Sequence, residues 1–114
     1  MKVLHLDIND PLIIQELSNA GFENHTDYLS TKKEIEEKIH RYDGIIIRSR
    51  FAIDKVFLKK ATRLKFIARV GSGLENIARD YAKTKGIELI SAPEGNRNAV
   101  AEHALGMLLC LFNN

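Results

Sequence analysis

The sequence is short of several features, and each shortage excludes a class of protein. It has a single cysteine, Cys110, so no internal disulfide can form, and no cysteine or histidine spacing suits zinc. It has no apolar run near the roughly 18 residues that cross a membrane. The amino-terminal stretch is too short and too charged for a signal peptide. We therefore expect a cytoplasmic protein with no membrane partner.

Charge of one sign is not in excess either. The 17 Lys and Arg residues stand against 15 Asp and Glu residues, which leaves a net charge of +2. Because these charges are scattered along the chain, we expect no nucleic-acid partner, while binding of a small anion stays possible. The length of 114 residues and the hydrophobic content of 45% fit one compact domain.

Short apolar runs alternate with helical patterns about every 20 residues. The run Ile45–Ile47 has no polar alternation, which is typical of a central parallel strand covered on both faces. Thr31 and Glu34 form a capping-box pattern before one helix, and Asp54 can cap the next. This succession of βα units predicts an α/β fold with a doubly wound, parallel, five-stranded sheet. We expect strands at 3–8, 22–26, 45–47, 64–70 and 87–90, and helices at 11–20, after Thr31, after Asp54 and at 76–85.

Open parallel sheets bind ligands beyond the carboxyl ends of their strands, so the residues that follow each strand form the candidate site. Arg48, Ser49 and Arg50 follow the third expected strand. Arg69 ends the fourth strand, and a glycine turn at 71–73 comes directly after it. Three guanidinium groups beside a glycine turn would suit a carboxylate or a phosphate. The alternative is that these arginines are solvated charges at strand ends.

The stretch RVGSGLEN, residues 69–76, is similar in pattern to a dinucleotide-binding glycine loop, but its context differs. Such a loop follows the first strand of a βαβ unit, and an acidic residue lies near the end of the next strand. Here Asn76 occupies the place of the third glycine, and Glu88 begins the next strand instead of ending it. We therefore expect this turn to cradle a small anion and not NAD. A glycine turn that binds no ligand is the alternative.

The carboxyl-terminal segment 99–112, AVAEHALGMLLCLF, is apolar on nearly all sides, and Glu102 and His103 are its polar exceptions. One sheet face cannot cover such a helix completely, so we expect a second domain or a second subunit against it. The predicted organisation is a domain over residues 1–97 and an interdomain helix over 98–114. On this helix we expect His103 to be packed and hydrogen-bonded, not catalytic.

Two stretches together carry a resemblance to a known family. RVGSGLENI and KGIELISAPEGNRNAVAEHALGMLL resemble the D-isomer-specific 2-hydroxyacid dehydrogenases, and the second stretch looks most like the D-3-phosphoglycerate dehydrogenase branch. The similarity spans roughly residues 44–112. It implies the amino-terminal part of a flavodoxin-like substrate domain, whose last helix crosses to an NAD-binding domain outside residues 1–114. It also implies a homodimer that acts on a small anionic 2-hydroxy or 2-oxo acid and is inactive as this segment alone.

The resemblance also assigns roles to individual residues. The arginine and serine after the third strand would bind the anionic substrate, and the backbone N–H groups of the glycine turn would hold its carboxylate. The arginine that ends the fourth strand would reach a substrate phosphate, and an asparagine would line the cleft. No catalytic or metal-binding residue falls within the chain. The substrate-binding residues implied in this way are Arg48, Ser49, Arg69, Val70, Gly71, Ser72 and Asn96.

The sequence departs from the family pattern in two places. Glu75 stands where aspartate is usual, and Arg50-Phe51-Ala52 replaces a small, threonine-containing segment.

Two other classes of protein share this sheet topology. A receiver-like signalling domain would use an acidic cluster such as Asp7 with Asp10, but its third strand ends in aspartate and not in arginine. A stand-alone flavodoxin-like ligand-binding or interaction domain that dimerises through its last helix stays open.

Overall fold

The computed structural model describes residues 1–9, 11–71, 74–92, 102 and 105–106. Its strands form one five-stranded sheet in the order β2-β1-β3-β4-β5, and every pairing is parallel. This order confirms the doubly wound, flavodoxin-like sheet expected from the sequence. The strands are β1 (Lys2–His5), β2 (Glu23–Thr26), β3 (Gly44–Ile47), β4 (Phe66–Val70) and β5 (Glu88–Ala92).

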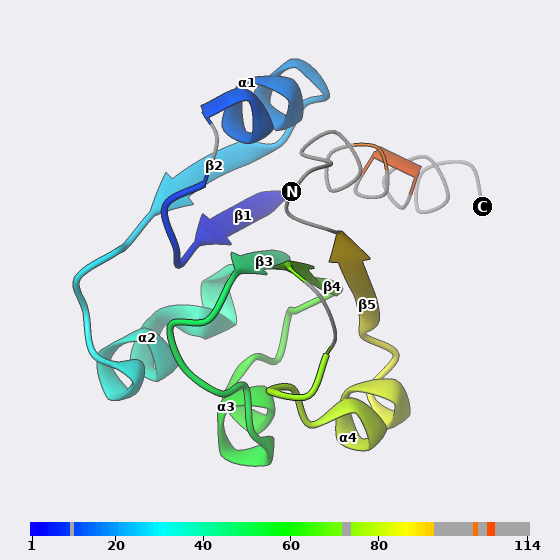
Figure 1. Cartoon of the computed structure of the whole chain (residues 1–114). Helices are drawn as coiled ribbons and strands as arrows, with labels where there is room; N and C mark the ends of the chain where they lie inside the picture. The colour runs from blue at the N-terminus through cyan, green and yellow to red at the C-terminus, as the bar shows by residue number, and fades with distance from the viewer. Residues whose placement is uncertain (10, 72–73, 93–101, 103–104, 107–114) are drawn as a thin grey trace.

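The helices lie on both faces of the sheet. Helix α1 covers one face, and α2, α3 and α4 lie side by side on the other (Figure 1). Thr31 accepts a hydrogen bond from the Glu34 N–H, and the Glu34 carboxylate accepts one from the Thr31 N–H, so the predicted capping box is confirmed. Asp54 caps the next helix through the Phe57 N–H at 2.9 Å. The described helices are α1 (Pro11–Asn19), α2 (Lys32–Lys38), the 3-10 turn η1 (Ile39–Arg41), α3 (Lys55–Lys60) and α4 (Arg79–Thr84).

Strand alternation divides the buried side chains into two cores. Ile45 and Ile67 belong to the core under α2, α3 and α4, whereas Ile46 and Phe66 belong to the core under α1. All four residues of β3 are buried, which confirms the central strand predicted from its unbroken apolar run. Strand β3 is thus packed on both faces, and it positions the loop that follows it.

Gly44 at the start of β3 is required by its neighbour in the sheet. Gly44 pairs with Phe66 in β4, and the Phe66 ring lies directly over it. A Cβ atom at position 44 would lie 2.2 Å from Cζ of Phe66. The ring also makes an edge-to-face contact with Phe22, with 6.3 Å between the centroids. Glycine therefore occupies this position to leave space for a buried aromatic side chain.

Helix α4 and strand β1 depart most from the ranges that the sequence pattern predicted, and hydrogen bonding explains both. The expected helix 76–85 begins at Arg79, because Ile77 first forms a parallel bridge with Ile53. The Ile53 N–H donates to the Asn76 carbonyl and the Ala78 N–H donates to the Ile53 carbonyl, both at 2.8 Å. The expected strand 3–8 ends at His5, because the chain then turns so that Asp7 can bond another loop.

The predicted apolar helix at 98–114 lies mostly outside the described residues. Its described members, Glu102, Leu105 and Gly106, are helical and exposed. Cys110 and His103 lie outside the described residues, and the domain boundary at 97/98 stays a prediction. Within the described ranges, no helix is long and apolar enough to cross a membrane.

Candidate functional site

The loops that follow β3 and β4 lie side by side at the carboxyl edge of the sheet. Ile47 is paired with Arg69, so Arg48 leaves β3 beside the last residues of β4. Further along, the bridge between Ile53 and Ile77 joins the two loops a second time. Ser49 is exposed, while Arg48 is only partly exposed. The structure thus brings together the arginine-serine pair and the glycine turn that the sequence singled out.

An internal carboxylate fixes the β3 loop. Oδ2 of Asp7 accepts hydrogen bonds from three consecutive backbone N–H groups, those of Arg48 at 2.6 Å, Ser49 at 3.1 Å and Arg50 at 3.3 Å. Successive amide groups that converge in this way form an anion-binding nest. Here the nest is filled by the chain's own carboxylate. A ligand at this loop would therefore have to bind side chains and not these amides.

Asp7 is one of the two acidic residues that a receiver-like domain would use to bind a metal ion. In the described part of the chain, no group of three or more His, Cys, Asp or Glu side chains could hold a metal ion. The bonds of Asp7 to the β3 loop instead account for its position after β1. The sequence pattern gave no signal for this role, because Asp7 and Arg48 are 41 residues apart in the chain.

Arg50 does not face a ligand, contrary to the expectation that three arginines line one concavity. Its guanidinium group donates to the carbonyl oxygens of Leu6, Asp27 and Ser30, and the Leu6 bond is 3.0 Å. These acceptors belong to the loops after β1 and β2. Arg50 therefore ties the β3 loop to both neighbouring loops, because the planar fork of arginine can bond several acceptors at once.

The β2 loop is itself held by Asp27. The Asp27 carboxylate accepts bonds from Nζ of Lys38 at 2.6 Å, the Ser30 hydroxyl at 2.7 Å and the Ser30 N–H at 2.9 Å. Burial by itself would raise the pKa of this carboxyl, but the bonds from Lys38, Ser30 and Leu29 outweigh it and hold the pKa of Asp27 well below its usual value. Three loops at the carboxyl edge are thus joined into one hydrogen-bonded unit.

The turn after β4 places Arg69 against Gly71. Gly71 is buried and has φ of 136°, a conformation that side chains disfavour. A Cβ atom there would lie 3.4 Å from Nη1 of Arg69, so the guanidinium group packs directly on this glycine. The Ser91 hydroxyl donates to the Gly71 carbonyl at 3.3 Å. Val70, the last residue of β4, is buried in the core under α1 and directly precedes Gly71. Ser72 and Asn96 lie outside the described residues.

Two histidines of the described part, His5 and His25, bond neighbouring side chains. His5 is buried in β1, and its Nε2 lies 2.8 Å from Oδ1 of Asn24. Nδ2 of Asn24 donates to the carbonyl oxygens of Ile14 and Phe22, so Oδ1 is the acceptor and His5 Nε2 carries a proton. Burial lowers the pKa of His5, and the bond to Asn24 only partly opposes it. His25 contacts Tyr42 and Glu23 on the edge strand β2.

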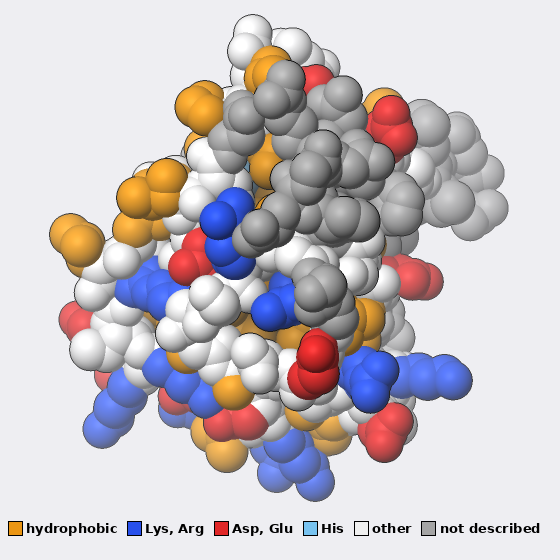
Figure 2. Space-filling view, in the orientation of Figure 1, with side chains coloured by type: hydrophobic (Ala, Val, Ile, Leu, Met, Phe, Trp, Pro, Cys, Tyr) orange, Lys and Arg blue, Asp and Glu red, His pale blue; other side chains and the backbone are white. Residues whose placement is uncertain are grey.

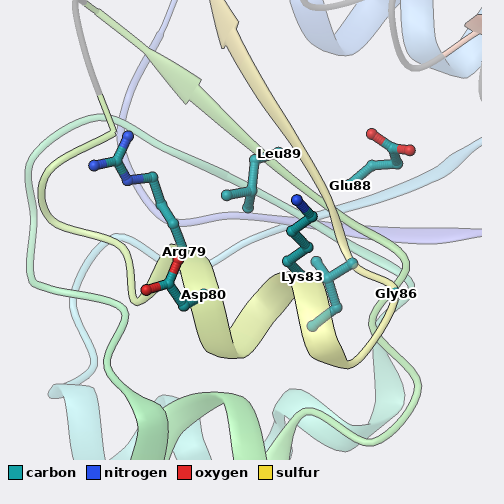
Figure 3. A pocket seen from close by; sticks show the side chains of 7 residues that line it. Arg79, Asp80, Lys83, Gly86, Glu88 and Leu89 are labelled. Atoms are coloured by element: carbon teal, nitrogen blue, oxygen red, sulfur yellow. The ribbon is translucent and has the colours of Figure 1, made fainter.

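A separate cavity lies between α4 and the edge strand β5 (Figure 3). Its volume is about 420 Å³, and it contains none of the residues predicted to bind substrate. Arg79 and Lys83 line it together with Asp80 and Glu88, so its formal charges cancel. A balanced and exposed lining does not favour an anion. Chemistry therefore favours the rim of β3 and β4 over this cavity as the anion site.

Basic side chains do not form one patch on the visible face of the molecule. Figure 2 shows Lys and Arg spread among acidic and apolar side chains over the region of α2, α3 and α4. This distribution matches the balanced composition, and it favours local recognition of a small anion over binding of a long polyanion.

The glycine turn does not fit a dinucleotide. It follows β4, the fourth strand of the chain, whereas a dinucleotide loop follows the first strand of its unit. The next strand, β5, begins with Glu88 and ends with Ser91 and Ala92, so it has no acidic residue near its end to bind a ribose. The described residues therefore give NAD no site of this kind.

Comparison with known proteins decides the family. Residues 3–107 match the family model described as D-isomer specific 2-hydroxyacid dehydrogenase, catalytic domain. The chain belongs to this family. The resemblance inferred from the glycine turn and the APEGN segment is thereby confirmed, and so is the fold that it implied. Members of the family are NAD-dependent dehydrogenases.

Relatives in this 2-hydroxyacid dehydrogenase family include several named enzymes. The chain is 31% identical over 109 residues to the D-3-phosphoglycerate dehydrogenase of Archaeoglobus fulgidus, covering 96% of the chain and 21% of that protein. It is 31% identical to the Sus scrofa enzyme of the same name, again covering 96% of the chain and 21% of that enzyme. The chain thus spans about a fifth of the length of these curated relatives.

Solved structures agree with the fold. The structure of NAD+-bound 3-phosphoglycerate dehydrogenase from Entamoeba histolytica matches with a TM-score of 0.72 and 28% identity, over 96% of this chain and 38% of that one. A protein from Pyrococcus horikoshii OT3 matches with a TM-score of 0.76 and 28% identity, over 95% of this chain and 32% of the other.

Proposed function

We propose that this chain forms the substrate-binding wall of an NAD-dependent D-2-hydroxyacid dehydrogenase whose substrate is D-3-phosphoglycerate. The single observation that carries the proposal is the pairing of Ile47 with Arg69, which sets Arg48 and the Gly71 turn at one edge of a sheet of this family. NAD and the groups that exchange protons with substrate would lie on polypeptide outside residues 1–114.

The chemistry of the substrate supports this choice. 3-Phosphoglycerate carries a carboxylate and a phosphate, and guanidinium groups recognise both through charge-assisted hydrogen bonds. In this proposal Arg48 and Arg69 bind the anionic groups, Ser49 donates its hydroxyl from the loop apex, and the backbone of Val70 and Gly71 faces the carboxylate. Arg69 is directed at the turn by its packing on Gly71. Ser72 and Asn96 stay predicted members of the same wall.

The described histidines give this wall no proton-transfer role. His5 is buried with its Nε2 bonded to Asn24, and His25 lies on the edge strand β2. A general acid or base must lie within hydrogen-bond reach of the substrate, whereas the imidazoles of His5 and His25 contact Asn24, Tyr42 and Glu23. The wall would bind and orient the acid, which is a contribution to rate through positioning.

Assembly remains part of the proposal. We expect a homodimer, and the segment 98–114 would contact either the nucleotide domain or a second subunit. The alternative, a stand-alone ligand-binding domain that dimerises through this helix, depends on residues outside the described part. Size-exclusion chromatography of residues 1–114 with light scattering separates a monomer from such a dimer.

Two observations test the proposed function. Residues 1–114 should show no reduction of NAD in the presence of 3-phosphoglycerate, measured by absorbance of the reduced cofactor. The coding sequence that follows Asn114 should encode a strand with a GxGxxG loop and, later, a histidine. Turnover by residues 1–114 alone would place catalytic groups inside the chain and contradict the proposal. A stop codon directly after Asn114 would favour the stand-alone binding domain.

A further inference from the structure

The β3 loop carries an anion of its own, and this feature goes beyond the proposed function. The Asp7 carboxylate accepts the N–H groups of three consecutive residues, 48–50, and its shortest bond is the 2.6 Å contact with the Arg48 N–H. Hydrogen bonds to a charged acceptor are stronger than neutral ones. The Asp7 carboxylate, which belongs to the loop after β1, therefore holds the backbone of Arg48 and Ser49 in place.

Arg50 completes the attachment from the side. Its guanidinium bonds carbonyl groups of the loops after β1 and β2, including Leu6, the residue before Asp7. The two side chains therefore act reciprocally: Asp7 of the β1 loop binds the backbone of the β3 loop, and Arg50 of the β3 loop binds the backbone of the β1 loop. Such a reciprocal pair fixes the separation of the two loops, since movement of either loop breaks both sets of bonds.

We infer that Asp7 and Arg50 are positioning residues, which hold Arg48 and Ser49 in the geometry needed to bind an anionic substrate. This inference rests on the proposed function of the rim. The Asp7 carboxylate occupies the amide nest, so the nest is closed to the substrate. Recognition then falls to the Arg48 guanidinium and the exposed Ser49 hydroxyl, whose placement depends on the nest being filled.

The inference predicts that an external anion can replace Asp7. In Asp7→Ala the nest loses its carboxylate, and formate is small enough to occupy the vacated position. Affinity of residues 1–114 for 3-phosphoglycerate, measured by titration of isotope-labelled protein in NMR, should fall on the order of tenfold. Formate should restore most of that loss, while sodium chloride at equal ionic strength should not. The Asp7→Asn variant keeps an oxygen acceptor and should lie between wild type and Asp7→Ala.

Matched variants separate positioning from general damage. Glu37→Ala removes one exposed carboxylate from α2 and should leave affinity unchanged. Arg50→Lys keeps the charge but loses the planar fork, so its affinity should fall, whereas Arg41→Ala, at an exposed arginine, should have no effect.

Each result decides one claim. Formate-dependent return of the amide shifts of residues 48–50 in Asp7→Ala supports the internal anion, even if 3-phosphoglycerate does not bind. The inference is overturned if the amide shifts of residues 48–50 in Asp7→Ala stay as in wild type. It is also overturned if Asp7→Ala loses affinity for 3-phosphoglycerate and formate does not restore it. Failure of the wild-type chain to bind either 3-phosphoglycerate or inorganic phosphate contradicts the proposed function, and with it the positioning role. The amide shifts then report only whether Asp7 fills the nest.

Discussion

The contact between Gly44 and Phe66 gives the sharpest prediction for the fold. In Gly44→Ala, the new methyl carbon would lie 2.2 Å from Cζ and 2.3 Å from Cε1 of Phe66. Carbon atoms pack at about 3.5 to 4.0 Å, so the ring must move by more than an ångström. The ring is fully buried and contacts Phe22, so it has little space in which to move.

The expected cost follows from two opposing effects. Overpacking of a core typically costs about 1 to 3 kcal/mol. Replacing glycine in a strand gains about 0.5 to 1 kcal/mol, because alanine loses less conformational freedom on folding. Because the 2.2 Å overlap is severe, we take overpacking at about 2 to 3 kcal/mol and expect the free energy of unfolding of Gly44→Ala to fall by about 1 to 2.5 kcal/mol, measured by urea denaturation with circular dichroism.

A double-mutant cycle tests the physical cause. Phe66→Leu shortens the side chain and vacates part of the space that a methyl group at position 44 would need. The double variant should be more stable than the sum of the two single changes predicts, by on the order of 1 kcal/mol. Additive costs would show that the ring does not oppose the methyl group. An undiminished stability of Gly44→Ala would refute the reasoning directly.

Three further predictions concern the helix cap, acid stability and the rim. Thr31→Ala removes the hydroxyl oxygen that accepts a hydrogen bond from the Glu34 N–H and should lower the free energy of unfolding by about 1 kcal/mol; an unchanged urea midpoint would contradict this. The pKa of Asp27 is lowered on folding from its usual 3.8. The contribution of Asp27 to the free energy of unfolding is therefore complete well above pH 3.8, and it is lost as the pH falls from there through the lowered pKa. Wild type should therefore lose more stability than Asp27→Asn between pH 5 and pH 3, in thermal melts; parallel curves would argue against the bond to Lys38. Arg48→Ala should weaken binding of 3-phosphoglycerate by about 1.5 to 3 kcal/mol, because a charge-assisted hydrogen bond is lost. An unchanged affinity would show that Arg48 does not bind the substrate.

Most of the fold could be predicted because its signals are local. The unbroken Ile45–Ile47 run indicated a central strand, and the Thr31–Glu34 spacing indicated a helix start, and both are confirmed. These patterns depend on neighbouring residues, whose periodicity and capping chemistry are set within a few positions. The late start of α4 was not predictable, because it depends on a bridge from residues 76–78 to Ile53 in another loop.

The candidate site was predictable only as a location. Strand order placed Arg48 and Gly71 at one edge, since carboxyl ends of parallel strands meet there. The roles of Asp7 and Arg50 were not predictable, because their partners are 20 or more residues away and are backbone groups, which leave no residue-type signal. The prediction that Arg50 helps line the concavity was wrong for this reason, since its guanidinium bonds three carbonyl groups instead.

The central claim is that the rim of β3 and β4 gathers the anionic acid. The most direct measurement is NMR titration of isotope-labelled residues 1–114 with D-3-phosphoglycerate, following each backbone amide. We predict saturable shifts at Arg48, Ser49, Val70 and Gly71, which in Arg48→Ala should need on the order of 10- to 100-fold more ligand to saturate. Shifts confined to the cavity between α4 and β5, or none at any described residue, would contradict it.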